Sequence, residues 1–185
     1  MELEEKCNMK ATGIVRRIDE LGRIVVPKEI RRTMRIREGD PMEIYTSEEG
    51  TILLKKYSPV GELSGISVQI AESMNHCGGN IAVITDRDRV IAVSGGKRDI
   101  VDKSISDELN KIISERKVIK DNHAYIPITE EDEGEGAQII SPVICNGDVI
   151  GSAILVGKDK RTFFNEGDSK MVIAVSMVLG KQMEN

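Results

Sequence analysis

The sequence from residue 13 to residue 32 reads GIVRRIDELGRIVVPKEIRR. Its apolar residues recur at even spacings, which is typical of half-buried strands, and they are Ile14, Ile18, Ile24 and Val26. Residues 19–22 between them favour a turn, because Asp19 can bond to nearby backbone and Gly22 tolerates a positive φ. Pro27 cannot donate to a sheet and suits the first position of a helix. The stretch therefore predicts a strand, a turn, a second strand and the start of a helix.

Basic side chains are concentrated in the same stretch. Six fall within seventeen positions: Arg16, Arg17, Arg23, Lys28, Arg31 and Arg32. They alternate with the apolar set, so folding should place them outside. A solvated charged face is the ordinary reading of such a run, but the density and single sign favour a surface for phosphates. The chain has few aromatic residues and no Trp, which favours duplex DNA over a base-stacking platform for single strands.

Four short runs carry a resemblance to a known family. They are KATGIVRR (10–17), GR (22–23), PKEIRR (27–32) and LLKKY (53–57). Together they resemble the DNA-binding domain of AbrB-type transition-state regulators, which implies an intertwined, swapped-hairpin dimer that binds DNA with few base-specific rules. The resemblance implies DNA contacts by Arg16, Arg23, Arg31 and Arg32. Arg17 and Lys10, from the same basic region, complete the candidate DNA-binding set.

The rest of this module is small. We expect a short helix over 28–34, followed by a break at Gly39-Asp40-Pro41. One strand should then begin at Met42 and a second should span 51–56, with a hairpin connection at 47–50. About fifty residues with four short strands and one helical turn cannot bury enough surface to fold alone. The module should therefore be a dimer on physical grounds as well.

Charge divides the chain into two parts. Residues 9–57 carry eleven basic and eight acidic side chains, a net charge of +3. Residues 1–8 have a net charge of −2 and residues 58–185 a net charge of −6, which together give the total of −5. Such asymmetry suggests a nucleic-acid module joined to a different one. Three cysteines without CxxC spacing fit a reducing cytoplasm, and we expect neither a signal peptide nor a membrane span. Translation could start at Met1 or at Met9.

The second module is expected to follow a linker at 58–62 and to span 63–185. The pattern predicts a helix over 63–74, strands at 80–85 and 89–93, a helix from Ser104 or Ser106 to Ser114, strands at 139–145 and 149–156, and a helix over 166–183. Asn146-Gly147 is a strong hairpin signal, and the acidic loop 130–136 should be mobile. This order predicts an α+β domain with an antiparallel sheet and helices on one face. With its run NGDVIG (146–151) it resembles a GAF-type sensor domain, but that resemblance transfers no binding residues.

Several patterns invite a catalytic or metal-binding interpretation that the residues do not support. The run SGGK (94–97) lacks the spacing of a phosphate-binding loop, so a plain turn is favoured. His76, Cys77, His123 and Cys145 lack the spacing of metal ligands or of a nucleophile with its base. The acidic residues 130–132 have no apolar pocket that would shift a pKa. We predict no enzyme activity, no cofactor and no metal.

Two helices of the second module have apolar residues that one domain does not obviously bury. Residues 171–179 are apolar nearly all round, with Ser176 as the one polar residue. We predict that these helices pack against copies in another chain and join dimers into a tetramer, through Leu63, Ile66, Ile70, Met74, Met171, Val175, Val178 and Leu179. The alternative is that the two helices pack against each other within one domain.

Together the resemblances imply a cytoplasmic, nucleoid-associated regulator of late sporulation genes that acts in the forespore. They imply both activation and repression, with DNA binding modulated by an unidentified small ligand or by a rearrangement of the oligomer. AbrB-like domains also occur in antitoxins, and in that alternative the second half would be a disordered segment that folds on a toxin. The expected strands between residues 80 and 157 argue against it. An enzyme would need catalytic residues that the second half lacks.

Overall fold

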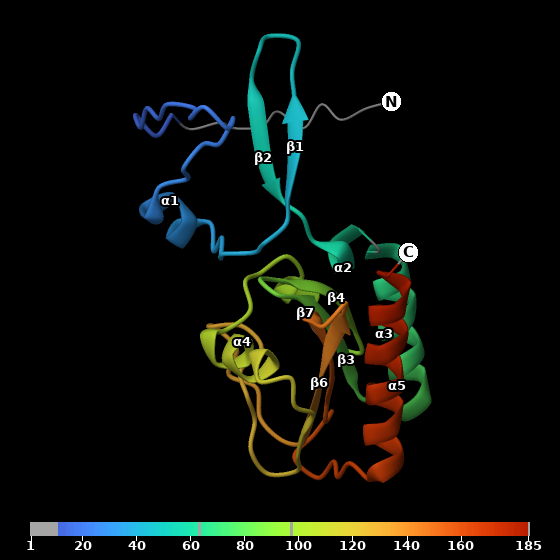
Figure 1. The fold of residues 1–185 in the computed structure, drawn as a ribbon. Helices are drawn as coiled ribbons and strands as arrows, with labels where there is room; N and C mark the ends of the chain where they lie inside the picture. The colour runs from blue at the N-terminus through green and yellow to red at the C-terminus, as the bar shows by residue number, and fades with distance from the viewer. Residues whose placement is uncertain (1–10, 63, 97, 185) are drawn as a thin grey trace. The chain divides into compact units, whose positions relative to one another are not determined.

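The computed structural model describes residues 11–62, 64–96 and 98–184, and the chain divides between Pro41 and Met42 into two compact units. In its described residues, the first unit contains the helix α1 (Lys28–Thr33). The second contains β1 (Met42–Thr46), β2 (Ile52–Lys56), α2 (Pro59–Glu62), α3 (Ser64–Gly78), β3 (Ile81–Asp86), β4 (Val90–Ser94), η1 (Arg98–Ile100), α4 (Asp107–Ser114), β5 (Ile119–Asp121), β6 (Gln138–Cys145), β7 (Asp148–Val156) and α5 (Glu166–Gln182) (Figure 1). None of the described helices is both long and apolar enough to cross a membrane.

The two strands predicted between residues 14 and 26 are not formed in the single chain. The turn between them is present, with Gly22 at φ 76°, but residues 11–19 and 23–27 have no regular structure. Ile14, Ile18 and Ile24 are all exposed. An isolated pair of strands is at best marginally stable in water, so these segments need a neighbouring sheet edge that one chain does not supply.

Strands β1 and β2 form the predicted hairpin. They pair antiparallel from Met42 opposite Lys56 to Thr46 opposite Ile52. In the connection, Gly50 has φ 79° and Ser47 Oγ accepts a hydrogen bond from the Thr51 backbone at 3.2 Å. The Gly and Ser supply the turn chemistry that the sequence predicted.

A five-stranded antiparallel sheet is the centre of the second unit, with strand order β4-β3-β7-β6-β5. Asn146 and Gly147, at φ 49° and 84°, form the predicted tight hairpin between β6 and β7. Both central residues of such a turn need positive φ, which Asn and Gly adopt most readily. The three-residue edge strand β5 was not predicted.

Both faces of this sheet are covered, which corrects the expectation of helices on one face. Helices α3 and α5 lie side by side over one face, and α4 lies over the other (Figure 1). The central strands explain this, because successive side chains point to opposite faces and both sets are apolar. In β7, Ala153 and Leu155 face α3 and α5, whereas Ile154 packs with Leu109 of α4.

Helix caps place the ends of α4 and α5 where the sequence predicted them. Ser106 is the N-cap of α4, and its Oγ accepts a hydrogen bond from the Leu109 backbone at 3.0 Å. Asn165 caps α5 in a reciprocal box with Asp168. At the other end of α5, a Cβ on Gly180 would lie 2.2 Å from the carbonyl oxygen of Ile144, so only glycine allows this approach to β6.

Two segments that were expected to be loose are held by specific contacts. In the predicted linker, α2 buries Val60 completely in the core under α3 and α5. In the acidic loop, Asp132 accepts hydrogen bonds from the Tyr125 hydroxyl and from the Ile128 and Gly134 backbones, at 2.5, 2.9 and 3.0 Å. The acidic loop is thus tied to the segment before it.

Candidate nucleic-acid interface

Asp19 organises the turn from which the first arginines extend. Its Oδ1 accepts hydrogen bonds from the backbones of Leu21 and Arg23 at 3.0 and 2.8 Å, and its Oδ2 accepts one from Arg23 Nε at 3.0 Å. The backbone hydrogen bond from Arg23, with the side-chain bond from Arg23 and the backbone bond from Leu21, lowers the pKa of Asp19 below its ordinary value. The Arg23 side chain remains 69% exposed. The turn therefore holds Arg23 at its backbone nitrogen and at Nε, while most of the side-chain surface stays exposed to water.

Helix α1 carries two of the remaining candidates. Arg31 and Arg32 lie in its last turn and are exposed. The helix ends at Thr33, within one residue of the predicted span 28–34. Arg35 adopts the left-handed conformation at φ 51° and the Ile36 backbone donates to the Arg31 carbonyl at 2.7 Å, which is the bond of a Schellman ending. Glycine is usual in such an ending, so the sequence pattern indicated the break at residues 39–41 and not at Arg35.

The predicted DNA-binding residues are accessible in the first unit. Arg16, Arg17 and Arg23 lie around the Asp19 turn, and Arg31 and Arg32 lie on α1. Among these five arginines, as the structure describes them, Arg23 forms an ion pair with Asp19, and an exposed pair of this kind is weak enough to exchange for a phosphate. Lys10 lies outside the described residues. An exposed guanidinium can bind a phosphate through two parallel hydrogen bonds.

The residues once considered for metal or nucleophilic chemistry have ordinary surroundings. The His76 ring is hydrogen-bonded to the Glu72 carbonyl of its own helix at 3.0 Å, and Cys77 is exposed at the end of α3. Cys145 is buried in β6, where burial raises the pKa of its thiol. In residues 11–62, 64–96 and 98–184, no group of three His, Cys, Asp or Glu side chains is placed to hold a metal ion. The run SGGK begins with Ser94, the last residue of β4, and continues with Gly95 at φ 77°, while its Lys97 lies outside the described residues.

The predicted oligomerisation residues separate into core and surface. Met74 and Leu179 are buried in the core of their own domain, which corrects their placement on an intermolecular face. Ile70, Met171 and Val175 pack partly against that core. Ile66 and Val178 are exposed, and Leu63 lies outside the described residues. Val68 and Met177 are also exposed but were not in the predicted set. The apolar pattern of a helix identifies candidate residues, but it does not show which of them pack inside their own domain and which stay exposed.

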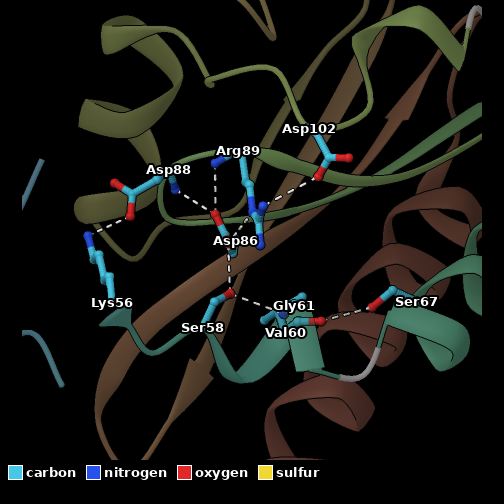
Figure 2. Close-up of polar contacts among 9 residues, drawn as sticks. All are labelled: Lys56, Ser58, Val60, Gly61, Ser67, Asp86, Asp88, Arg89 and Asp102. Atoms are coloured by element: carbon cyan, nitrogen blue, oxygen red, sulfur yellow. Dashed lines mark hydrogen bonds and ion pairs between the residues drawn. The ribbon is translucent and has the colours of Figure 1, made fainter. Parts of the chain in front are cut away.

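Sequence patterns also missed a polar cluster where the β1–β2 hairpin joins the domain built on the five-stranded sheet (Figure 2). Lys56, the last residue of β2, forms an ion pair with Asp88, and Ser58 donates a hydrogen bond to Asp86. These partners lie about thirty residues apart in sequence, so no local spacing could indicate them. Asp86 and Asp88 lie between the strands predicted at 80–85 and 89–93, and the sequence indicated no role for them.

Comparisons with known proteins match both halves of the chain. The family model for the stage V sporulation protein T C-terminal region, described as a transcription factor, matches residues 62–184. The model for MazE, an antidote-toxin recognition protein and bacterial antitoxin, matches residues 15–62. Stage V sporulation protein T of Bacillus subtilis is 43% identical over 95% of this chain and 99% of its own. Transition state regulatory protein AbrB of the same organism is 51% identical over 34% of this chain and 71% of its own.

Among solved structures, a GAF domain shows the fold of the second half. The GAF domain of Acinetobacter phosphoenolpyruvate-protein phosphotransferase superposes with a TM-score of 0.56 at 15% identity, over 65% of this chain and 81% of that one. The likeness is one of fold alone. It confirms the predicted GAF-like domain with its antiparallel sheet, and the AbrB-type first half agrees with the sequence matches.

Proposed function

Because the chain belongs to the family of stage V sporulation protein T, we propose that it controls late sporulation genes, activating some promoters and repressing others. The family membership makes it a DNA-binding transcriptional regulator rather than an enzyme. The observation that supports the finer proposal is the match along nearly the whole chain, since 43% identity extends through both modules. The protein would act in the cytoplasm of the forespore, on the nucleoid.

DNA binding is proposed to use Arg16, Arg17, Arg23, Arg31, Arg32 and Lys10. Five of these side chains are exposed in the structure, and Lys10 lies outside the described residues. They would contact mainly phosphates, which gives affinity with few base-specific rules. A dimer formed through the first module would bring two such sets to one duplex.

A small ligand or a rearrangement of the oligomer is proposed to modulate binding through the sensor domain. Such an effector must bind one arrangement of the DNA modules better than another, since only differential affinity shifts an equilibrium. The exposed Ile66, Val68, Met177 and Val178 support association of sensor domains into a tetramer. Apolar side chains exposed on neighbouring helices are what a second copy would cover.

Fluorescence anisotropy of the full chain with a labelled duplex tests the DNA-binding proposal. We expect the logarithm of the binding constant to fall linearly with the logarithm of salt concentration, and an unlabelled duplex to compete better than a single strand of the same length. Salt-independent binding, or preference for the single strand, would contradict it. Mapping of bound DNA across the genome during spore formation then tests the assignment to late genes.

The antitoxin alternative has one specific observation in its favour, the match of residues 15–62 to the MazE model. An antitoxin of that kind would keep its toxin-binding segment disordered until the toxin binds. Limited proteolysis of the full chain separates the two functions. A regulator with a folded sensor domain should leave a resistant fragment that includes residues 64–182, whereas an antitoxin should lose that region first.

A further inference from the structure

The segment between β2 and α3 is fixed to the sensor domain at several points. Ser58 Oγ donates to Asp86 Oδ2 at 2.7 Å and accepts from the Gly61 backbone at 3.1 Å. Val60 is completely buried, and its carbonyl accepts a hydrogen bond from the buried Ser67 at 3.4 Å. A connection with these contacts does not behave as a flexible tether.

Lys56 extends this attachment into the hairpin itself. Its Nζ lies 2.5 Å from Asp88 Oδ2, and the two side chains keep only 20% and 23% of their surface exposed. Among the described residues no donor reaches Oδ1 of Asp88, which is buried. The ion pair with Lys56 is therefore important for this carboxylate, because a partly buried charge is costly when its partner is lost.

Both acceptors, Asp86 and Asp88, belong to the turn between β3 and β4 (Figure 2). Asp86 also shapes that turn, since its Oδ1 accepts from the backbones of Asp88 and Arg89, each at 2.7 Å. Arg89 reaches Asp86 at 3.6 Å and Asp102 at 3.4 Å. A Cβ on Gly61 would lie 2.9 Å from Ser58 Oγ, so glycine at this position keeps the hydroxyl in place.

The same turn contacts the core on the α4 face of the sheet. The carbonyl of Asp88 accepts a hydrogen bond at 2.9 Å from the backbone of Ile105, which is completely buried in that core. The next residue, Ser106, is the N-cap of α4. A shift of α4 would thus reach Asp88 through one backbone hydrogen bond, and Asp88 holds Lys56.

From these contacts we infer that the β3–β4 turn is a latch, made by Asp86 with Ser58 and by Asp88 with Lys56, through which the sensor domain sets the orientation of the β1–β2 hairpin. The hairpin lies within residues 15–62, which match the MazE family model, and the coupling to DNA rests on the proposed function. With the latch closed, the hairpin and the sensor move together. With the latch open, the hairpin loses the two side-chain contacts that join it to the β3–β4 turn.

Hydrogen exchange of the full chain tests the latch directly. In Ser58→Ala we expect exchange of the backbone amides of Tyr57, residue 58, Val60 and Gly61 to accelerate about tenfold, because Gly61 loses its acceptor and the segment loses its hydrogen bond to Asp86. Lys56→Gln should have a similar effect, while Lys55→Gln, an equal charge change at an exposed neighbouring position of β2, should leave exchange unchanged. The double variant Lys56→Asp with Asp88→Lys exchanges the two charges and keeps the ion pair, so its amides should exchange about as slowly as those of the wild type.

Duplex affinity of the same samples tests the coupling. We expect Ser58→Ala and Lys56→Gln to bind the duplex about tenfold more weakly than Lys55→Gln does. In the two latch variants the β1–β2 hairpins would move independently of the sensor domains, so they would no longer be held in one orientation before DNA binds. Unchanged exchange in both latch variants would overturn the latch, and raised exchange with unchanged affinity would overturn its role in DNA binding. A wild-type chain that binds no duplex would overturn the proposed function, and the exchange data would still decide the latch. Ser58→Ala keeps the ion pair between Lys56 and Asp88, so this variant still tests the latch if Lys56→Gln unfolds.

Discussion

Asp19 accepts hydrogen bonds from both the backbone nitrogen and the Nε of Arg23, at 2.8 and 3.0 Å. One carboxylate thus closes the turn and positions a residue proposed to contact DNA. Asp19 also bonds the Leu21 backbone, so the acidic residue at the centre of a basic stretch serves the geometry of its neighbours.

The carboxyl group of Asp19 should titrate below the ordinary value of about 3.9 for aspartate. Its stabilisation of the turn should therefore be fully present above that pH and should be lost as the pH falls through the lower, folded-state pKa. A carbon-13 NMR titration of the carboxyl measures this. In Arg23→Ala the backbone bond remains but the side-chain bond is lost, so the pKa should move part of the way back. A wild-type midpoint at or above the ordinary value would contradict the geometry.

The first module should be an obligate dimer in the full chain. The even-spaced apolar set includes Ile24, whereas its neighbour Val25 points to the other side of the predicted strand. We expect Ile24→Glu to sediment with about half the mass of Val25→Glu, because a charge at the dimer core prevents association. In the wild type the melting temperature should rise with protein concentration, since folding and association are linked. Equal masses for the two variants would contradict the swapped-hairpin arrangement.

The acidic loop should depend on the hydroxyl of Tyr125. Burial, with the hydrogen bond to Asp132, raises the pKa of Tyr125 far above its ordinary range, so the hydroxyl stays a donor. Tyr125→Phe should lower the free energy of unfolding in urea by about 1–2 kcal/mol. Gly134→Ala should cost more, because its Cβ would lie 2.3 Å from the Tyr125 ring. Wild-type stability in both variants would contradict this account of the loop.

Local chemistry explains which elements the sequence could predict. Asn146-Gly147 and the cap of Ser106 each depend on residues within a few positions, so the hairpin and the start of α4 were predicted correctly. The left-handed Arg35 was missed because glycine usually marks such a helix end. The strands predicted near Ile24 are not formed, because apolar spacing indicates a strand without showing whether a partner strand is there to pair with it.

Long-range contacts explain why only part of the candidate sites could be predicted. The basic stretch is continuous in sequence, so its arginines were visible directly. Lys56 and Ser58 find their partners in a turn about thirty residues away, and only the folded structure shows this. In the same way, apolar spacing placed Leu179 and Val178 in one stripe, although the first is completely buried and the second is 52% exposed.

That pair of neighbours provides a test of the tetramer. Val178→Glu should dissociate the full chain to dimers without unfolding it, because the side chain is exposed within its own domain. Leu179→Glu should unfold the sensor domain, because it places a charge in the core. Sedimentation with circular dichroism separates the outcomes. A wild-type chain that sediments as a dimer at micromolar concentration, or a tetrameric Val178→Glu variant, would contradict association through this face.

Exposed arginines of the first unit are proposed to bind the phosphates of duplex DNA, and the salt dependence of binding measures those contacts. Arg23→Ala and Arg31→Ala should each lower the slope of log binding constant against log salt by about 0.9 per lost phosphate contact and weaken binding to many sequences. Arg161→Ala, an equal charge change at an exposed position of the sensor domain, should leave the slope unchanged. If the salt-dependence slope and the duplex affinity are the same in all three variants as in the wild type, the assignment of these arginines to DNA binding is contradicted.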